Sequence, residues 1–300
     1  MPGRVGVVAA LVAVLCACSA GSGRTSSDRD LSAYTGLATW VDLYDPDVLA
    51  HPESSVAAMV QHGVSTLFLQ TSNYEMSSDV VRPARISRFI EAAHANGMEV
   101  VAWYLPSLVN VARDQRRSLA ALNFKTPDGE HFDSFALDIE SSIVKPASTR
   151  SARLVLLSRR LRAAAPGTAL GAIVPAPVGM QRLPWYWPGF PFVALAKDFD
   201  VFLPMGYFTY RSHLASFSGP YTRANIALLR TKTGNPALPV HPIGGIAGVA
   251  STAQVRAFER AAQAGDALGA SLYDFSGTTA AQWRELQPAR YLPAATRASG

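Results

Sequence analysis

The sequence predicts an α/β protein built as a single (β/α)8 (TIM) barrel, and two observations lead to this fold class. From about Tyr34, short apolar runs alternate with helical patterns, which is typical of a parallel sheet covered by helices. The alternation gives eight strands in roughly 250 residues, the usual size of such a barrel. An open doubly wound sheet is the alternative, but no predicted strand is followed by the Gly-x-Gly-x-x-Gly turn typical of that fold.

The predicted elements follow one another in regular order along the chain. Strands are expected at 37–43, 65–70, 99–104, 134–139, 170–174, 201–205, 239–243 and 270–274. Helical patterns lie between them at 52–62, 83–96, 148–164, 221–233, 252–264 and 280–286. Pro52 and Pro83 stand near helix starts, and Gly97, Gly234 and Gly265 stand near helix ends, the positions that these residue types prefer.

The N-terminal segment is predicted to lie outside the barrel. Residues 1–18 combine a basic start with the apolar run 5–15 and with Leu15-Cys16-Ala17-Cys18, which resembles the bacterial lipobox. This resemblance implies export and lipidation of Cys18, which would anchor the chain to the outer face of the cell membrane. A signal peptide cleaved near Ala20, giving a secreted protein, is the alternative. Residues 19–33 are predicted to be a flexible tether, 34–290 the barrel and 291–300 a C-terminal tail.

The composition excludes several classes of protein. A hydrophobic content of 49% excludes a mostly disordered chain, and two cysteines exclude both a disulfide framework and a four-cysteine zinc module. The net charge of +5 includes no Lys/Arg run typical of a nucleic-acid surface, so no nucleic-acid partner is predicted. No histidine stands at ligand spacing from an acidic residue, so neither a metal nor another cofactor is predicted.

Polar and aromatic residues gather at the carboxyl ends of the predicted strands, where such a barrel carries its active site. The predicted substrate-binding residues are Asp42, Tyr44, Gln70, Trp103, Tyr104, Tyr207, Tyr273 and Asp274, together with Trp185 in the loop after the fifth strand. Aromatic rings cover the apolar faces of sugars, while carboxylates and amides bind their hydroxyls. This set therefore indicates a glycan as substrate or ligand.

The strongest chemical signal lies on the fourth strand. Alternate residues of a strand share a face, so Ala136, Asp138 and Glu140 are predicted to point into the barrel while the apolar residues between them pack outward. The Cβ atoms of the two acidic residues would then lie about 6.6 Å apart. Two carboxylates this close in a partly dry mouth do not both ionise easily, so one keeps a proton for a leaving oxygen. A helix-cap or salt-bridge pair at a strand end, without a catalytic role, is the alternative.

Two motifs carry a resemblance to a known family. The segment 133–140 resembles the Asp-x-x-Asp-x-Asp-x-Glu signature of the chitinase-like family 18 glycoside hydrolases, with Ala136 in place of the middle Asp. The segment 205–207 resembles the Met-x-Tyr at the end of that family's sixth strand. The barrel as a whole also looks like the glycosidase-like lipoproteins of GC-rich bacteria.

The resemblance implies a role for three residues. Glu140 would be the general acid/base, and Asp138 would orient the 2-acetamido group of the substrate, which itself attacks the anomeric carbon. Tyr207 would donate a hydrogen bond to the acetamido oxygen. A muramidase-like scheme, in which Asp42 joins Asp138 and Glu140, stays open.

Two classes of function follow. The first is a surface-anchored glycoside hydrolase acting on an N-acetylated glycan. The second is a catalytically inactive barrel lipoprotein that binds a carbohydrate or scaffolds the cell envelope, which is favoured by Ala136 and by the Trp-Tyr-Leu-Pro end of the third strand. A deacetylase or another metal hydrolase is disfavoured because metal-ligand spacing is missing.

Overall fold

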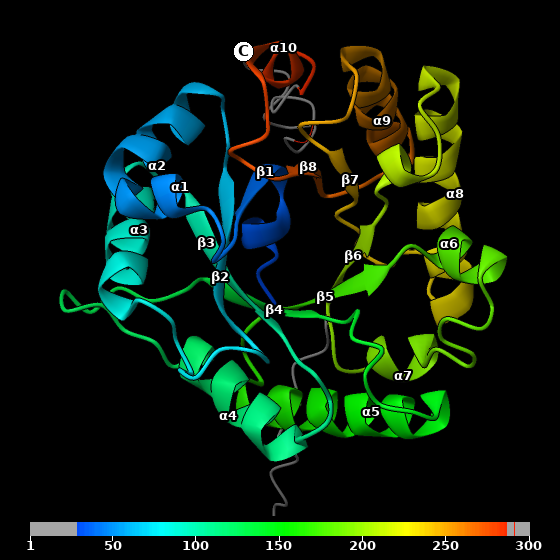
Figure 1. Ribbon diagram of the computed structural model, residues 1–300, viewed down its shortest axis with the longest axis horizontal. Coiled ribbons are helices and arrows are strands. Elements are labelled where there is room, and N and C mark those ends of the chain that lie inside the picture. The colour runs from blue at the N-terminus through cyan, green and yellow to red at the C-terminus, as the bar shows by residue number, and fades with distance from the viewer. Residues whose placement is uncertain (1–28, 287–290, 292–300) are drawn as a thin grey trace, which may run out of the picture.

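The eight strands close into one parallel barrel (Figure 1). The computed structural model describes residues 29–286 and Tyr291. Each strand pairs with the next, and the last pairs with the first, which confirms the predicted (β/α)8 fold. The strands are β1 (Gly36–Val41), β2 (Thr66–Asn73), β3 (Glu99–Leu105), β4 (Ser134–Asp138), β5 (Leu170–Pro175), β6 (Val201–Met205), β7 (Ile243–Ile246) and β8 (Gly269–Tyr273).

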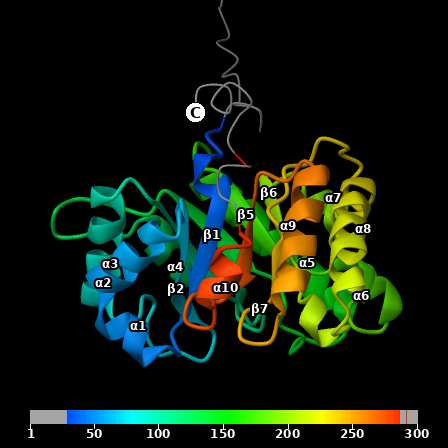
Figure 2. The same cartoon turned by 90° about the horizontal axis from the view of Figure 1, so that it is seen from above.

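Helices cover the outside of the barrel (Figures 1 and 2). They are α1 (Pro46–Ala50), α2 (Pro52–Gln61), α3 (Pro83–Ala95), α4 (Val111–Leu122), α5 (Ala147–Ala164), α6 (Pro177–Arg182), α7 (Phe192–Leu195), α8 (Ala215–Thr233), α9 (Thr252–Ala264) and α10 (Ala280–Trp283). Pro52 and Pro83 each occupy the first helical turn, as the sequence indicates. None of the described helices is both long enough and apolar enough to cross a membrane.

The seventh strand lies further along the chain than predicted. The sequence places it at 239–243, whereas β7 begins at Ile243, and Val240 forms only an isolated bridge with Phe202. Pro239 and Pro242 have no N–H group to donate to a ladder, which explains why regular pairing starts only after Pro242. The carboxyl end of the strand therefore extends to Ile246.

Aromatic side chains fill the interior of the barrel. Trp40 stacks on Phe68 with 4.2 Å between ring centroids. At the amino-terminal end of the barrel, the hydroxyl of Tyr34 forms a 2.7 Å hydrogen bond with the hydroxyl of Ser134. His241 is fully buried beside this core, and its burial lowers its pKa to about 4, so the ring is neutral. The interior is thus packed up to the mouth.

The boundaries of the barrel differ from those that the sequence suggests. Residues 29–33, predicted as part of the tether, lie against the barrel: Arg29 forms a 2.7 Å ion pair with Asp200, and Ala33 is buried. Tyr291, the first residue of the predicted tail, is also buried, and its hydroxyl donates to Glu259 over 2.7 Å. The predicted signal peptide, including Cys18, lies outside the described residues.

Candidate active site

Asp138, the last residue of β4, and Glu140, two residues beyond the strand, lie at the mouth of the barrel. Ala136 packs in the interior core, whereas Phe135 and Leu137 pack in the outer core beneath the helices. This is the alternation that the sequence predicts for the strand. Asp138 follows on the inward face with 7% of its surface exposed, and Glu140, two residues further on, is exposed at the rim.

A cavity of about 410 Å³ opens at this mouth. It is lined by Tyr44, Gln70, Asn73, Tyr74, Glu75, Trp103, Leu105, Asp138, Glu140, Met205, Tyr207, Tyr210, Ile246 and Tyr273. Most of these side chains are aromatic, carboxylate or amide groups, which is the composition expected of a site for a hydroxyl-rich ligand. A larger surface hollow of about 560 Å³ beside α6 and α7 contains neither Asp138 nor Glu140.

The carboxyl groups of Asp138 and Glu140 are both easier to protonate than usual. Burial raises the pKa of Asp138 well above its ordinary value, and the nearby charge of Glu140 raises it further. The surrounding wall also raises the pKa of Glu140 by removing water from its carboxylate. Neither group forms an ion pair within the described part of the chain. The Oδ1 atom of Asp138 is buried and has no hydrogen-bond partner among the described residues.

Tyr207 is held at the mouth by a strained turn. Its φ angle of 38° lies in the left-handed region, where bulky residues are rare. Its main-chain N–H donates to the Gly244 carbonyl over 2.6 Å, and the N–H of Gly206 donates to the Ile243 carbonyl over 2.8 Å. Burial raises the pKa of the Tyr207 hydroxyl well above its ordinary value, and the charges of Asp138 and Glu140 add to this effect. The hydroxyl therefore stays protonated and can donate a hydrogen bond.

Asp42 supports the wall of the cavity instead of facing into it. Tyr273 donates its hydroxyl proton to one Asp42 oxygen over 2.5 Å, and the main-chain N–H of Tyr44 donates to the other over 2.7 Å. The Tyr44 hydroxyl in turn accepts a 2.7 Å hydrogen bond from Asn73. These contacts fix two aromatic rings of the wall, and they occupy the carboxylate that a muramidase-like scheme would use.

Gln70 and Trp103 line the floor of the cavity. The Oε1 atom of Gln70 accepts a 3.1 Å hydrogen bond from the main-chain N–H of Leu43, which fixes the direction of the amide. The Nε1–H of Trp103 is buried and has no hydrogen-bond partner among the described residues. The Trp103 N–H is thus a donor, and the Oδ1 atom of Asp138 an acceptor, that a ligand could pair with.

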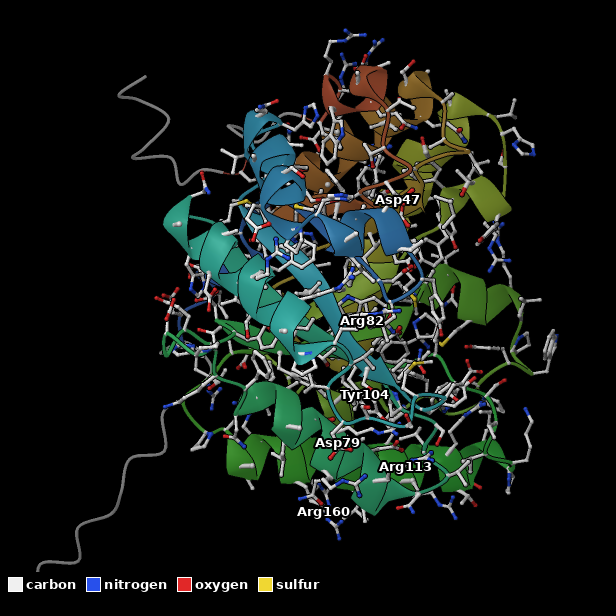
Figure 3. The ribbon with its side chains drawn as sticks, turned by 60° about the vertical axis from the view of Figure 1, so that its left-hand side comes forward. Asp47, Asp79, Arg82, Tyr104, Arg113 and Arg160 are labelled. Atoms are coloured by element: carbon white, nitrogen blue, oxygen red, sulfur yellow. The ribbon has the colours of Figure 1, made fainter. Side chains whose placement is uncertain are left out.

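Besides Asp42, three predicted substrate-binding residues do not line this cavity. Tyr104, which is labelled in Figure 3, points away from the barrel interior and donates a 2.7 Å hydrogen bond to Asp114 of α4. Trp185 is 74% exposed in the loop after α6 and does not line the cavity. The Oδ1 atom of Asp274 accepts the main-chain N–H of Gly277 over 2.9 Å, so this carboxylate stabilises a turn.

Asp133, the first acidic residue of the motif, lies at the opposite end of β4. Its Oδ2 atom accepts the main-chain N–H of Val100 over 2.7 Å and lies 3.0 Å from Nε2 of His94. It therefore joins β4 to β3 and α3 and takes no part in the mouth. Among the residues that the structure describes, no three His, Cys, Asp or Glu side chains are grouped closely enough to hold a metal ion.

Other cavity residues are absent from the sequence-based prediction. Tyr74 and Glu75 enter from the loop after β2, which extends to Asn73, three residues beyond its predicted end. A register shift between Gln70 and Ser72 changes which side chains of β2 face the cavity. The only available signal was the polar run after the predicted strand, and it does not reveal a bulge.

The described fold is similar to that of several solved glycoside hydrolases. The endo-β-1,4-mannanase from Thermotoga petrophila matches with a TM-score of 0.62 and 10% identity over 84% of this chain and 69% of that chain. A class V chitinase from Pseudomonas fluorescens Pf-5 matches with a TM-score of 0.60 and 11% identity over 85% of this chain and 99% of that chain. The spore cortex-lytic enzyme SleL from Bacillus cereus matches with a TM-score of 0.62 and 8% identity over 86% of this chain and 74% of that chain. No family model and no curated protein matches the sequence. At these identities the similarity concerns the fold alone, a (β/α)8 barrel.

Proposed function

We propose that the protein is a glycoside hydrolase that cleaves an N-acetylated glycan, with Glu140 as general acid/base and Asp138 as its assistant. The observation that carries this proposal is the free, buried Oδ1 of Asp138 beside Glu140 in the cavity. A buried carboxylate oxygen without a partner is costly to maintain, so a ligand donor is the natural partner for it. The sugar-like composition of the cavity wall and the neighbours' glycoside-hydrolase fold support the same function.

The geometry suits a reaction in which the substrate supplies the nucleophile. Asp138 accepts a hydrogen bond from the N–H of the 2-acetamido group. This contact orients the carbonyl oxygen of the acetamido group toward the anomeric carbon. That oxygen forms a bond to the anomeric carbon while the bond to the leaving oxygen breaks, and Glu140 donates its proton to the leaving oxygen. Tyr207 donates a hydrogen bond to the acetamido oxygen and holds it in line. Water then attacks the anomeric carbon, the bond from that carbon to the acetamido oxygen breaks, and the Glu140 carboxylate takes the proton from that water.

The raised pKa values fit these roles. A general acid must hold a proton at the working pH, and burial raises the pKa of Glu140 in that direction. In some barrel glycosidases the nucleophile comes from the seventh strand, but β7 carries no acidic residue in Ile243–Ile246, so a carboxylate nucleophile from that strand is missing. An acetamido group on the substrate fills this role.

The test compares Glu140→Gln with the wild type on chitin oligosaccharides and on peptidoglycan, scored by release of reducing ends. We expect Glu140→Gln to lose about 10²–10⁴-fold in rate, the contribution of a general acid. Glu75→Gln is the matched control, since it removes another carboxylate of the same cavity and should retain most of the activity. Equal activity of Glu140→Gln and the wild type would overturn the role of Glu140. Binding by the wild type without any turnover would favour the inactive carbohydrate-binding protein instead.

We also propose that the chain is anchored to the outer face of the membrane through a lipid on Cys18. The described chain begins at the amino-terminal end of the barrel, where Tyr34 contacts Ser134, the first residue of β4. The mouth lies at the other end of that strand, so an anchor on this side leaves the mouth facing away from the membrane. Cell fractionation tests this: Cys18→Ala should leave the membrane fraction, and the control Cys16→Ala should remain in it. Equal membrane retention of both variants would overturn the anchor.

A further inference from the structure

A second cavity of about 210 Å³ adjoins the first one at Glu140. Four residues line both cavities: Glu140, Met205, Tyr207 and Tyr210. A ligand whose scissile oxygen lies at Glu140 can therefore place one neighbouring group in the first cavity and another in this side cavity. The far wall of the side cavity is mainly apolar and comes from the end of β5 and from α6.

Arg211 is the exception in this apolar wall. It directly follows the short helix η3 (Phe208–Tyr210), on the same loop as Tyr207, and its side chain is exposed. Within the described part of the chain, Arg211 forms neither an ion pair nor a side-chain hydrogen bond. Its Nη2 atom lies 3.2 Å from the position that a Cβ atom on Gly179 would occupy, so the missing side chain of Gly179 leaves room for the guanidinium group.

Tyr221 adds a second donor below the same gap. Its hydroxyl lies 3.5 Å from the same hypothetical Cβ position on Gly179, is buried, and has no partner among the described residues. Two unpaired groups, one of them positively charged, thus approach one point next to the side cavity. Unpaired buried hydroxyls and uncompensated guanidinium groups at a cavity are arrangements that an anionic ligand group stabilises.

The charge distribution favours an anion in the side cavity over the first cavity. The first cavity is lined by the carboxyl groups of Asp138, Glu140 and Glu75, which would repel a negative group, whereas the side cavity is lined by Glu140 as its one carboxyl group among the described residues. Arg211 is the one Lys, Arg or His among the described residues that line the two cavities. A guanidinium group pairs with a carboxylate through two parallel hydrogen bonds, which selects for that group over a neutral one.

We propose that the side cavity binds a carboxylate carried by the sugar next to the scissile bond, and that Arg211 is the residue that selects for it. This inference rests on the proposed function and narrows its substrate class to acidic N-acetylated glycans. Two chemistries supply such a carboxylate: a lactyl ether on an amino sugar and a hexuronic acid. Both place a carboxylate within one sugar residue of the glycosidic oxygen, so the experiment must separate them.

The experiment measures equilibrium binding by calorimetry in the Glu140→Gln background, which prevents turnover. The probes are the disaccharide of N-acetylglucosamine and N-acetylmuramic acid, the disaccharide of N-acetylglucosamine and glucuronic acid, and the methyl ester of each. Arg211→Gln and Arg211→Lys are added to this background. Arg182→Gln is the matched control, because Arg182 is an exposed arginine on the neighbouring α6 that packs over Phe217 and does not line the cavity.

We expect at least one acid to bind about tenfold more tightly than its ester, the order expected for a hydrogen bond to a charged group. Arg211→Gln should abolish that preference, Arg211→Lys should keep part of it, and Arg182→Gln should keep all of it. The acid that shows the preference identifies the source of the carboxylate. Equal binding of acids and esters, or equal weakening of both by Arg211→Gln, overturns the carboxylate site.

The outcomes also separate this inference from the proposed function. An Arg211-dependent preference together with no turnover by the wild type would overturn the glycosidase and leave the carboxylate site established. Turnover of neutral chitin oligosaccharides without any preference for acids would support the glycosidase and overturn the carboxylate site. Absence of binding by every probe would overturn the carboxylate site, and together with absence of turnover by the wild type it would overturn both proposals.

Discussion

The hydroxyl of Tyr186 donates a 2.6 Å hydrogen bond to the main-chain carbonyl of Glu140. Tyr186 is itself held by Arg150, whose Nη2 donates to the Tyr186 carbonyl over 2.7 Å. The Arg150 guanidinium group lies 3.8 Å from the ring centroid of Trp187, at the distance of a cation–π contact. The aromatic loop after α6 thus fixes the main chain of the proposed general acid, in addition to lining the side cavity.

Tyr186→Phe tests this positioning role. The variant keeps the ring and loses one hydrogen bond of about 1 kcal/mol, so kcat should fall about three- to tenfold with less change in KM. The pH dependence of kcat should also change, because the Glu140 carboxyl group would sit in a less defined environment. Steady-state kinetics on the best glycan substrate across pH measures both effects.

Tyr104→Phe is the matched control for that variant. Tyr104 also donates its hydroxyl proton over 2.7 Å, but to Asp114 in the outer core. Its loss should lower the unfolding free energy by about 1–3 kcal/mol, because Asp114 is left buried with one partner fewer, and should leave the pH dependence of kcat unchanged. If both variants change the kinetics alike, the Tyr186 contact has no special role.

Asp138→Asn should make the folded protein more stable at neutral pH. The folded-state pKa of Asp138 lies well above its ordinary value of 3.8, so the folded state binds a proton more tightly than the unfolded chain. The charged group therefore costs stability, and this cost grows as pH rises from about 4 through the folded-state pKa. Thermal unfolding at pH 7 should show a higher Tm for the variant, with the difference disappearing below about pH 4.

Asp79→Asn should have the opposite effect on Tm at neutral pH. The ion pair with Arg116 lowers the pKa of Asp79, so its charged form stabilises the fold above the ordinary pKa and loses that contribution as pH falls. Thermal unfolding of this variant should give a lower Tm at pH 7, and the difference should be small because the ion pair is partly exposed. A lower Tm for Asp138→Asn at neutral pH would contradict the assigned burial cost at the active site.

The fold and the carboxylate pair were predictable because both depend on short-range periodicity. Apolar runs separated by helical patterns specify the barrel, and the alternation of Ala136 and Asp138 with outward apolar residues specifies the inner face of β4. The predicted bounds of β7 were wrong, since Pro239 and Pro242 lie where apolar periodicity alone suggests a strand.

The remainder of the site depends on contacts that periodicity does not encode. Trp103 and Tyr104 are consecutive in one strand, so only one of them can face the mouth, and placing both there was the error. The register shift in β2 and the clamp of Arg150 on Tyr186 join segments far apart in the sequence. Such contacts become visible only in three dimensions.

Trp103→Phe should weaken glycan binding with little effect on stability. The variant removes a buried N–H that has no partner among the described residues, and this gain offsets much of the lost packing, so the unfolding free energy should change by less than about 1 kcal/mol. Affinity should fall about tenfold if a ligand acceptor pairs with that N–H. Calorimetric titration and chemical denaturation measure the two quantities.

Trp40→Phe is the matched control for Trp103→Phe. Trp40 donates its Nε1–H to Ser271 over 2.9 Å and stacks on Phe68, so its replacement should destabilise the fold by about 2–3 kcal/mol. Glycan affinity should stay within twofold at temperatures where the variant is folded. A reversed pattern, with affinity loss in Trp40→Phe alone, would remove Trp103 from the binding site.

Gly206→Ala should reduce activity by displacing Tyr207. A Cβ atom at Gly206 would lie 2.7 Å from the Ile243 carbonyl oxygen, and this neighbour is main chain that cannot rotate away. The loop from β6 must therefore shift, which breaks the Gly206–Ile243 hydrogen bond and moves the Tyr207 hydroxyl, the proposed donor to the acetamido oxygen. We expect a loss of about 1–3 kcal/mol in unfolding free energy and at least a tenfold loss in kcat.

Gly248→Ala separates this steric effect from a general sensitivity of the loops at the mouth. A Cβ atom at Gly248 would meet no atom within 4 Å, and its φ angle lies outside the left-handed region, so alanine should be tolerated. Kinetics and chemical denaturation of the two variants should therefore diverge. Wild-type kcat in Gly206→Ala would show that the position of Tyr207 is not needed for turnover. The acetamido contact would then have to come from another donor of the cavity wall, such as the buried Trp103 N–H.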